Sequence, residues 1–405
     1  MRRLFSAYRD AFVGLPRPIW LLAISSLINR CGTMVLPFAT LYLTKELGWT
    51  VPEAGLALSF YGVGAMVGSF SGGWLADRIS VRLVLVTSLV GNGLGFLALE
   101  HLVSRSAICW FLVALGTFSE AFRPANATAL STIAGPENRV RAFTLYRLAI
   151  NLGMSIGPVL GGFLAEHDYR WLFRVDGGTC LAAAAMLGIL FRDPMPHGGP
   201  AESSDATARA GRSPWRDGPF LALLGLAVLL AMVFFQIQST YPLALNRVYG
   251  FSEASIGLAL SVNTVVIVLF EMVLAHALRN APHLRLVAWG SLLFGVGLAL
   301  LPFGRSFLYV CATIFVWTIG EMLSLPFLQG VVAERADAKR RGTYLGLLSF
   351  AFSVAYMSGP SIGAWVYERF GPDSLWYACG AAGVVLWVGF ETLARRTRWT
   401  TGPES

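Results

Sequence analysis

The chain has 405 residues, of which 55% are hydrophobic and only 13% are charged, and its mean hydropathy is +0.61. A soluble globular domain carries about 25% charged residues, so this composition excludes a water-soluble protein. The formal net charge of +8 could suggest a nucleic acid partner, but the Lys and Arg residues lie almost wholly in short segments between apolar runs. That distribution is typical of a membrane protein, and we expect no nucleic acid partner.

Twelve apolar runs are long enough to cross a bilayer, which takes about 20 residues in a helix. In chain order they are 18–43, 54–76, 83–102, 107–133, 142–165, 172–191, 219–245, 254–277, 286–303, 307–333, 344–366 and 375–393. Because a helix satisfies its own backbone hydrogen bonds, we predict an all-α membrane protein with twelve transmembrane helices.

The segment between the sixth and seventh runs is rich in Pro, Gly, Ser and charged residues, which indicates a cytoplasmic linker over 192–218. We therefore predict one six-helix bundle over 1–191 and a second over 219–405. With the N-terminus in the cytoplasm, 21 of the 31 Lys and Arg residues fall in cytoplasmic segments and seven fall on the opposite side. This bias predicts that both termini are cytoplasmic in a multi-pass protein of the cell (inner) membrane.

The two halves of the chain repeat each other. The sequence GLALS occurs at Gly55–Ser59 and again at Gly257–Ser261. The pattern GPxxG occurs at Gly157–Gly161 and again at Gly359–Gly363, and both pairs share an offset of 202 residues. Repeats of this kind are typical of transporters that bind their substrate between two pseudo-symmetric halves.

A basic segment follows the second predicted helix and reads GGWLADRISVRLVLV from Gly72 to Val86. It resembles motif A of the major facilitator superfamily, whose pattern is roughly G-x-L-A-D-R-x-G-R-[RK]. The matching positions are Gly73, Leu75, Ala76, Asp77, Arg78 and Arg82. Ser80 replaces the usual glycine and Val81 an arginine. The resemblance implies a cytoplasmic conformational latch in which Asp77 helps to lock the outward-facing state; the alternative is an ordinary loop after a membrane helix.

The fifth predicted helix carries NLGMSIGPVLGG, which resembles motif C of the superfamily's antiporters. The matching residues are Gly153, Gly157, Pro158, Gly161 and Gly162. Glycines at this spacing let helices approach closely, and proline bends a helix, so the motif could form a pliable contact. The alternative is ordinary packing of small residues. The arginine of the antiporters' motif B is absent, because Leu112 occupies the position four residues before Gly116.

Six ionisable residues stand out inside the predicted helices, where a charge at the centre costs about 2.5–3.5 kcal/mol. They are Arg30, Glu120, Arg123, Arg147, Glu271 and Glu321. Glu120 and Arg123 are three residues apart and share one helix face, which suits either an ion pair or a coupling role. Arg30, Glu120 and Glu321 are expected near mid-membrane.

The resemblance implies that the first, fourth, seventh and tenth helices line a central cavity. Candidate cavity residues are then Arg30, Glu120, Arg123, Glu321, Gln236, Gln238 and Tyr241. Glu321 is our first candidate for a proton carrier, because burial disfavours its charged form and its own helix offers no cation; pairing with Arg30 is the alternative. Arg30 is expected either to hold an anionic substrate group or to pair with a glutamate.

The leading hypothesis is a proton-coupled exporter of small amphipathic, drug-like molecules that works as a monomer by alternating access. The second is a proton-coupled importer of peptides or another zwitterion. The first helix supports it, because Arg30 and the LYLT at Leu41–Thr44 resemble peptide transporters, although Asn29 and Cys31 depart from their pattern. A receptor or a lipid-modifying enzyme is a third class. No catalytic, metal or phosphate-binding pattern supports an enzyme, and we expect no cofactor other than the coupling ion, either protons or sodium.

Overall fold

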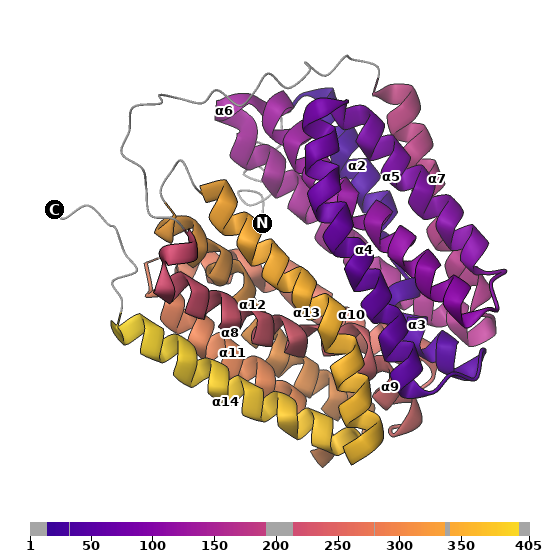
Figure 1. Cartoon of the computed structure of the whole chain (residues 1–405), viewed down its shortest axis with the longest axis vertical. Helices are drawn as coiled ribbons and strands as arrows, with labels where there is room; N and C mark the ends of the chain where they lie inside the picture. The colour runs from indigo at the N-terminus through magenta and orange to yellow at the C-terminus, as the bar shows by residue number, and fades with distance from the viewer. Residues whose placement is uncertain (1–13, 32, 192–213, 279, 337–340, 397–405) are drawn as a thin grey trace, which may run out of the picture. The chain divides into compact units, whose positions relative to one another are not determined.

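The structure is a computed structural model that describes residues 14–31, 33–191, 214–278, 280–336 and 341–396 (Figure 1). Within these ranges all regular structure is helical and no residue is in a β-strand. The predicted all-α class is therefore confirmed. Both chain termini and most of the predicted linker lie outside the described residues, so their cytoplasmic side stays a prediction.

Within each of two parts of the chain, 17–190 and 214–396, the helices follow one another with short connections. In the first part of the chain they are α2 (Arg17–Cys31), α3 (Val35–Lys45), α4 (Val51–Arg78), α5 (Val81–Leu99), α6 (Arg105–His167) and α7 (Arg170–Leu190). In the second part they are η1 (Pro214–Arg216), α8 (Gly218–Phe234), η2 (Phe235–Gln238), α9 (Thr240–Arg247), α10 (Glu253–Ala277), α11 (His283–Ala299), η3 (Leu301–Phe303), α12 (Phe307–Arg335), α13 (Arg341–Phe370) and α14 (Pro372–Arg396).

Eleven segments of the described chain are long and apolar enough to cross a bilayer. They correspond to eleven of the twelve predicted runs. The remaining run, 107–133, forms the first part of α6, where Glu120, Arg123 and Asn126 lower the hydropathy. Because this stretch is helical throughout, it supplies the twelfth helix of the predicted fold. The first and seventh predicted helices are each interrupted midway, between α2 and α3 and at η2.

By their internal contacts the residues form two compact units. The first consists of Met1–Val35 and Val63–Ser204, and the second of Leu36–Gly62 and Asp205–Ser405. The second unit thus contains most of α3 and the first half of α4, which the predicted division at 192–218 assigns to the other bundle. Contacts such as the hydrogen bond between Ser59 and Ser361, 2.7 Å between their Oγ atoms, bring that part of α4 into the second unit. The division of the sequence into two six-helix bundles stays a prediction.

In the first unit, α5 packs against α6 and α7, and α2 packs against the same two helices (Figure 1). Its core consists of aliphatic side chains and alanines, such as Leu22, Leu85 and Ala125. The second half of α4 meets α6 through three glycines one turn apart, each against the backbone of one α6 residue. The pairs are Gly64 with Val113, Gly68 with Thr117 and Gly72 with Ala121. Glycines let the two backbones touch, as in other membrane helix pairs.

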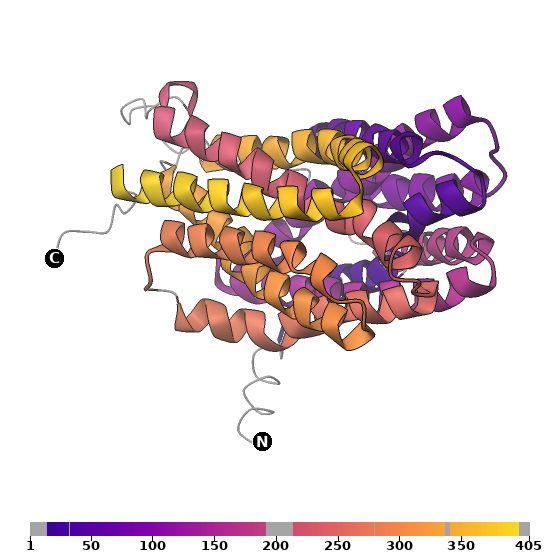
Figure 2. The ribbon, with the colours of Figure 1, turned by 90° about the horizontal axis from the view of Figure 1, so that it is seen from below.

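In the second unit, α11 packs against both α12 and α14, and α8 packs against α13 and α14 (Figure 2). Three of these helices are joined at one end by a buried carboxylate, because Asp217 precedes α8 and is only 4% exposed. Its side chain accepts a hydrogen bond from the Phe220 amide at 3.3 Å, from Arg335 Nε on α12 at 2.7 Å and from the Tyr344 hydroxyl on α13 at 3.1 Å. Burial raises the pKa of Asp217, but the Arg335 guanidinium outweighs it, so the pKa lies below the ordinary value of 3.8.

Replacing this carboxylate tests its part in stability. We expect Asp217→Asn to lower the free energy of unfolding by about 3 kcal/mol, because Arg335 then loses its buried partner. Folding lowers the pKa of Asp217 below its ordinary value of 3.8. The carboxylate therefore stabilises the fold fully at a pH above that ordinary value, and this stabilisation is lost as the pH falls through the lowered pKa. The melting temperature of purified Asp217→Asn should therefore lie below that of wild type at neutral pH, and this difference should become smaller in acid. The exposed Asp373→Asn is the control; equal melting of all three proteins at neutral pH would contradict the role.

Candidate functional site

Arg30 lies in the last turn of α2, immediately before the interruption of the first helix. The Thr33 amide donates to the Arg30 carbonyl at 3.1 Å, and the chain resumes as a helix at Val35. Gly153 and Gly157 of the antiporter-like motif lie against this point on α6. A Cβ atom added to Gly153 would meet the Arg30 Cβ at 2.5 Å, and one added to Gly157 would meet the Arg30 carbonyl oxygen at 3.1 Å. The motif glycines therefore leave room for the end of α2 and position Arg30.

The pair predicted from helix spacing is present. Arg123 Nη1 lies 3.2 Å from Glu120 Oε2, and the Arg123 side chain is 64% exposed against 20% for Glu120. The exposed guanidinium can reach other groups, whereas the carboxylate is committed to its neighbour. A part for this pair in proton coupling stays a prediction.

The motif A residues occupy the connection between α4 and α5. Arg82 donates to the Gly188 carbonyl near the end of α7, and the Arg78 guanidinium lies 4.7 Å from the centre of the Trp74 ring. Ser80, which replaces the motif's glycine, caps α5 by accepting from the Leu83 amide at 3.4 Å. The side chain of Asp77 lies outside the described residues, and Gly73 is half-buried. The latch stays a prediction.

Glu321 lies in the middle of α12 in the second unit. Its Oε2 accepts a hydrogen bond from Asn263 Nδ2 on α10 at 2.8 Å, and the same amide group lies 3.1 Å from Thr318 Oγ1. Glu321 is half-buried. Sequence reasoning missed Asn263, although a polar amide within the eighth apolar run was a usable signal.

The interruption of the seventh helix is held by Gln236 in η2. Its Nε2 donates to the Met232 carbonyl at 3.0 Å and to the Gly359 carbonyl on α13 at 2.9 Å, and its Oε1 accepts from Thr240 Oγ1 at 2.9 Å. A methyl group on Gly363 would overlap the Gln236 amide. The second GPxxG copy thus packs against the interruption of the seventh helix, as the first copy packs against that of the first helix.

Two other predicted cavity residues have different surroundings. Tyr241 is fully buried, with its ring centre 6.3 Å from that of Trp317 and 5.6 Å from that of Trp376. It therefore packs in the aromatic core of the second unit. Gln238 ends η2 and remains half-buried.

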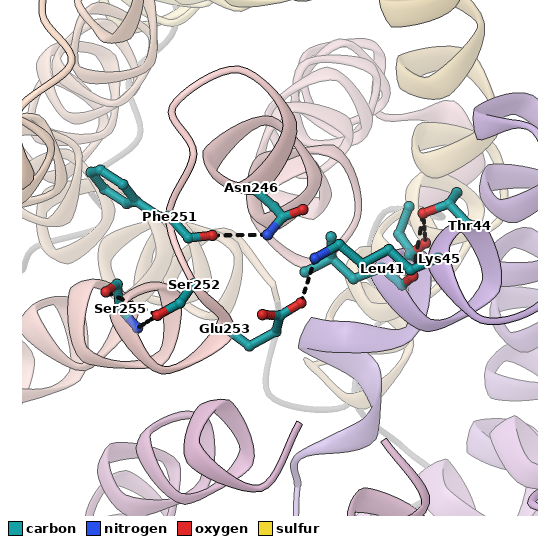
Figure 3. A network of polar contacts seen from close by, with 9 residues as sticks. Leu41, Thr44, Lys45, Asn246, Phe251, Ser252, Glu253 and Ser255 are labelled. Carbon is teal, nitrogen blue, oxygen red and sulfur yellow. Dashed lines mark hydrogen bonds and ion pairs between the residues drawn. The ribbon is translucent and has the colours of Figure 1, made fainter. Parts of the chain in front are cut away.

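One more contact of the second unit joins the end of α3 to the start of α10 (Figure 3). Lys45 Nζ lies 2.7 Å from Glu253 Oε1, with side chains 37% and 10% exposed. Ser252 caps α10 beside it by accepting from the Ser255 amide at 3.3 Å. The pair connects a helix from the first predicted bundle to one from the second, which helps to explain why most of α3 belongs to the second unit.

Asp176, a buried acid of the first unit, was not identified from the sequence. Asp176 on α7 is 1% exposed and accepts hydrogen bonds from the Met34 and Val35 amides at the start of α3. It lies near the start of the sixth apolar run. The available signal was that Asp176 is followed by Gly-Gly and a further apolar stretch instead of a loop.

The helices and the polar groups buried among them are those of a polytopic membrane transporter. The profile of the Major Facilitator Superfamily matches residues 22–278 and 223–405. The chain therefore belongs to the major facilitator superfamily, and it is a transporter, not an enzyme.

Relatives along nearly the whole chain support this class. The uncharacterized MFS-type transporter YqjV of Bacillus subtilis is 26% identical and covers 93% of this chain and 92% of its own. A Na(+), Li(+), K(+)/H(+) antiporter of Planococcus maritimus is 23% identical, with 89% of each chain covered. The multidrug resistance protein MdtH of Yersinia enterocolitica is 22% identical, with 88% of this chain and 89% of its own covered.

Solved structures share the fold. A peptide transporter POT in complex with sulfate has a TM-score of 0.80 at 17% identity, covering 96% of this chain and 97% of its own. A mutant of the nucleoside transporter NupG has a TM-score of 0.78 at 14% identity, covering 93% of this chain and 99% of its own. At these identities the likeness shows the fold alone.

Adding a methyl group at Gly363, beside Gln236, tests how the interruption of the seventh helix is held in place. We expect Gly363→Ala to lower the free energy of unfolding by about 1–3 kcal/mol, because the added methyl displaces the Gln236 amide from the Gly359 carbonyl. The matched control is Gly346→Ala on the same helix, where an added Cβ meets nothing within 4 Å and should leave stability unchanged or slightly raised. The melting temperatures of the two variants test this expectation. Equal melting temperatures for Gly363→Ala and Gly346→Ala would contradict the packing role of Gly363.

Proposed function

We propose that the protein is a proton-coupled exporter of small amphipathic molecules that works by alternating access in the cell (inner) membrane. The observation that carries the proposal is the carboxyl group of Glu321 in the middle of α12. A carboxylate at such a depth costs about 2.5–3.5 kcal/mol on insertion scales, so it is retained for a function.

The surroundings of Glu321 suit a group that takes up and releases a proton. Its side-chain partner is the neutral amide of Asn263, at 2.8 Å. Among the described residues of the second unit no cation lies within ion-pair distance of it. An amide N–H can donate to a carboxylate and to the carbonyl oxygen of a carboxylic acid alike. Protonation would then change the charge of the site without dismantling it.

Two further observations support export. The Gly153 and Gly157 positions of α6 resemble the antiporters' motif and let α6 touch the interrupted first helix at Arg30. Among the relatives, MdtH is named a multidrug resistance protein, and the Planococcus maritimus protein is named a cation/proton antiporter. The first name supports drug-like substrates, and the second supports exchange against protons.

The second candidate is a proton-coupled importer of peptides or another zwitterion. Arg30 favours it, because a half-buried guanidinium beside an interrupted helix could bind a carboxylate of the substrate. In this case protons and substrate would move in the same direction.

Transport by the purified protein in proteoliposomes tests the proposal. With an acidic lumen, wild type should accumulate a lipophilic cation such as ethidium as protons leave. A sodium gradient without a pH gradient should drive no uptake. Accumulation of a labelled dipeptide driven by protons moving inward, with no ethidium uptake, would contradict export and support the importer.

The role of Glu321 in proton coupling is tested in the same proteoliposomes. We expect Glu321→Gln to reduce proton-driven ethidium uptake to the level of protein-free liposomes, because the amide cannot bind the proton. Counterflow exchange of ethidium should persist, since it needs no net proton movement. The control Glu334→Gln changes an exposed acid on the same helix and should transport as wild type does. Unchanged proton-driven uptake in Glu321→Gln would rule out the coupling role.

A further inference from the structure

The interruption between α2 and α3 creates a local problem of hydrogen bonding. After Cys31 the helix ends, and α3 begins at Val35, so the first amides of α3 have no carbonyl in a preceding turn. Inside a membrane no water is available to satisfy them, and each unsatisfied group costs several kcal/mol. Some other part of the protein has to accept these hydrogen bonds.

Asp176 on α7 fills this need. Its Oδ2 accepts from the Val35 amide at 2.8 Å and from the Met34 amide at 3.1 Å, and its Oδ1 lies 3.0 Å from the same Met34 nitrogen. The side chain is 1% exposed. Hydrogen bonds to an ionised acceptor are about twice as strong as neutral ones, and a negative charge also suits the positive end of a helix dipole. The hydrogen bonds from the start of α3 are therefore stronger when Asp176 is ionised than when it is protonated.

The groups around Asp176 do not neutralise it. Cys180 lies one turn further along α7 and accepts hydrogen bonds from the amides of Asn29 on α2 and Asn92 on α5, at 3.2 and 3.8 Å. Both Asp176 and Arg30 act electrostatically on the Cys180 thiol, yet no cation among the described residues of the first unit lies within ion-pair distance of Asp176.

The other titratable groups of the packed helices lie elsewhere or are engaged. Cys31 ends α2, and α6 carries Tyr146 and Arg147 about two turns before Gly153. Three arginines of these helices bind other partners: Arg82 of α5 the Gly188 carbonyl, Arg174 of α7 the Glu100 carboxylate and Arg123 of α6 the Glu120 carboxylate. The charge of Asp176 is thus opposed by burial and supported by two backbone amides, and a proton is the simplest ligand that can change this balance.

We propose that Asp176 is a second proton-binding site, which holds the interruption of the first helix when ionised and loosens it when protonated. The proton binds a carboxylate oxygen, and that oxygen becomes a donor with less capacity to accept from the Met34 and Val35 amides. A metal cation fits poorly, because amide N–H groups already point at both oxygens. Arg30 lies directly before the interruption, so loosening would move it. The part of this site in transport rests on the proton coupling proposed above.

Infrared spectroscopy of the full chain in lipid tests proton binding directly. Acidification of wild type should produce a C=O band of a protonated carboxyl group that is absent from Asp176→Asn. The band should persist in Glu321→Gln and in the control Asp168→Asn, which changes an exposed acid just before the same helix. Asp176→Glu keeps a titratable group, and should restore a band at a changed position even where Asp176→Asn folds poorly.

The outcomes separate this site from the proposed function. Identical acid difference spectra of wild type and Asp176→Asn would overturn the proposal. A change in the carboxylate band on adding Na⁺ or Li⁺ at constant pH, absent in Asp176→Asn, would replace it with a cation site. If Asp176 titrates but no proton gradient drives ethidium, the proposed export fails and the proton site stands. If protons drive ethidium and Asp176 does not titrate, the site fails and the proposed export stands.

Discussion

Two helices of this protein stop and restart inside the membrane, and the backbone N–H and C=O groups there need partners that only the protein can supply. In water such groups would be hydrated, but in a bilayer they must be satisfied internally. At the first helix the carboxylate of Asp176 accepts from backbone amides, and at the seventh the side-chain amide of Gln236 donates to backbone carbonyls. Arg30 borders the first interruption and Gln238 the second, so the positions of predicted cavity residues follow from how these interruptions are held.

The sequence repeat explains why both interruptions are possible. Glycines in or just before each GPxxG copy lie against an interrupted helix: Gly153 and Gly157 against Arg30, and Gly359 and Gly363 against Gln236. The chemistry nevertheless differs between the halves. The position equivalent to Asp176 at the 202-residue offset is Ala378, so the second half has no acid there. One half holds its interrupted helix with a group that can bind a proton, and the other with a group that cannot.

Hydropathy and motifs predicted the fold well, because membrane helices are long and apolar and the motif residues are close in sequence. The Glu120–Arg123 pair also followed from spacing, since residues three apart share a helix face. The interruptions could not be predicted in this way, because an apolar run looks the same whether or not its helix is continuous. Asp176 and Asn263 could not be placed either, since their partners lie 142 and 58 residues away in the chain. The aromatic packing of Tyr241 could not be predicted either, since its ring partners Trp317 and Trp376 lie on other helices.

The claim that an ionised Asp176 holds the first interruption while a neutral Gln236 holds the second is tested most directly by amide hydrogen exchange. Exchange of wild type in lipid should be followed at the start of α3 and at η2 to α9, at neutral and acidic pH, with rates corrected for the intrinsic effect of pH. At the start of α3 acidification should speed corrected exchange about tenfold, the effect of losing one hydrogen bond to a charged group. Exchange at η2 to α9 should not change. Equal responses of the two segments, or no response at α3, would contradict the claim.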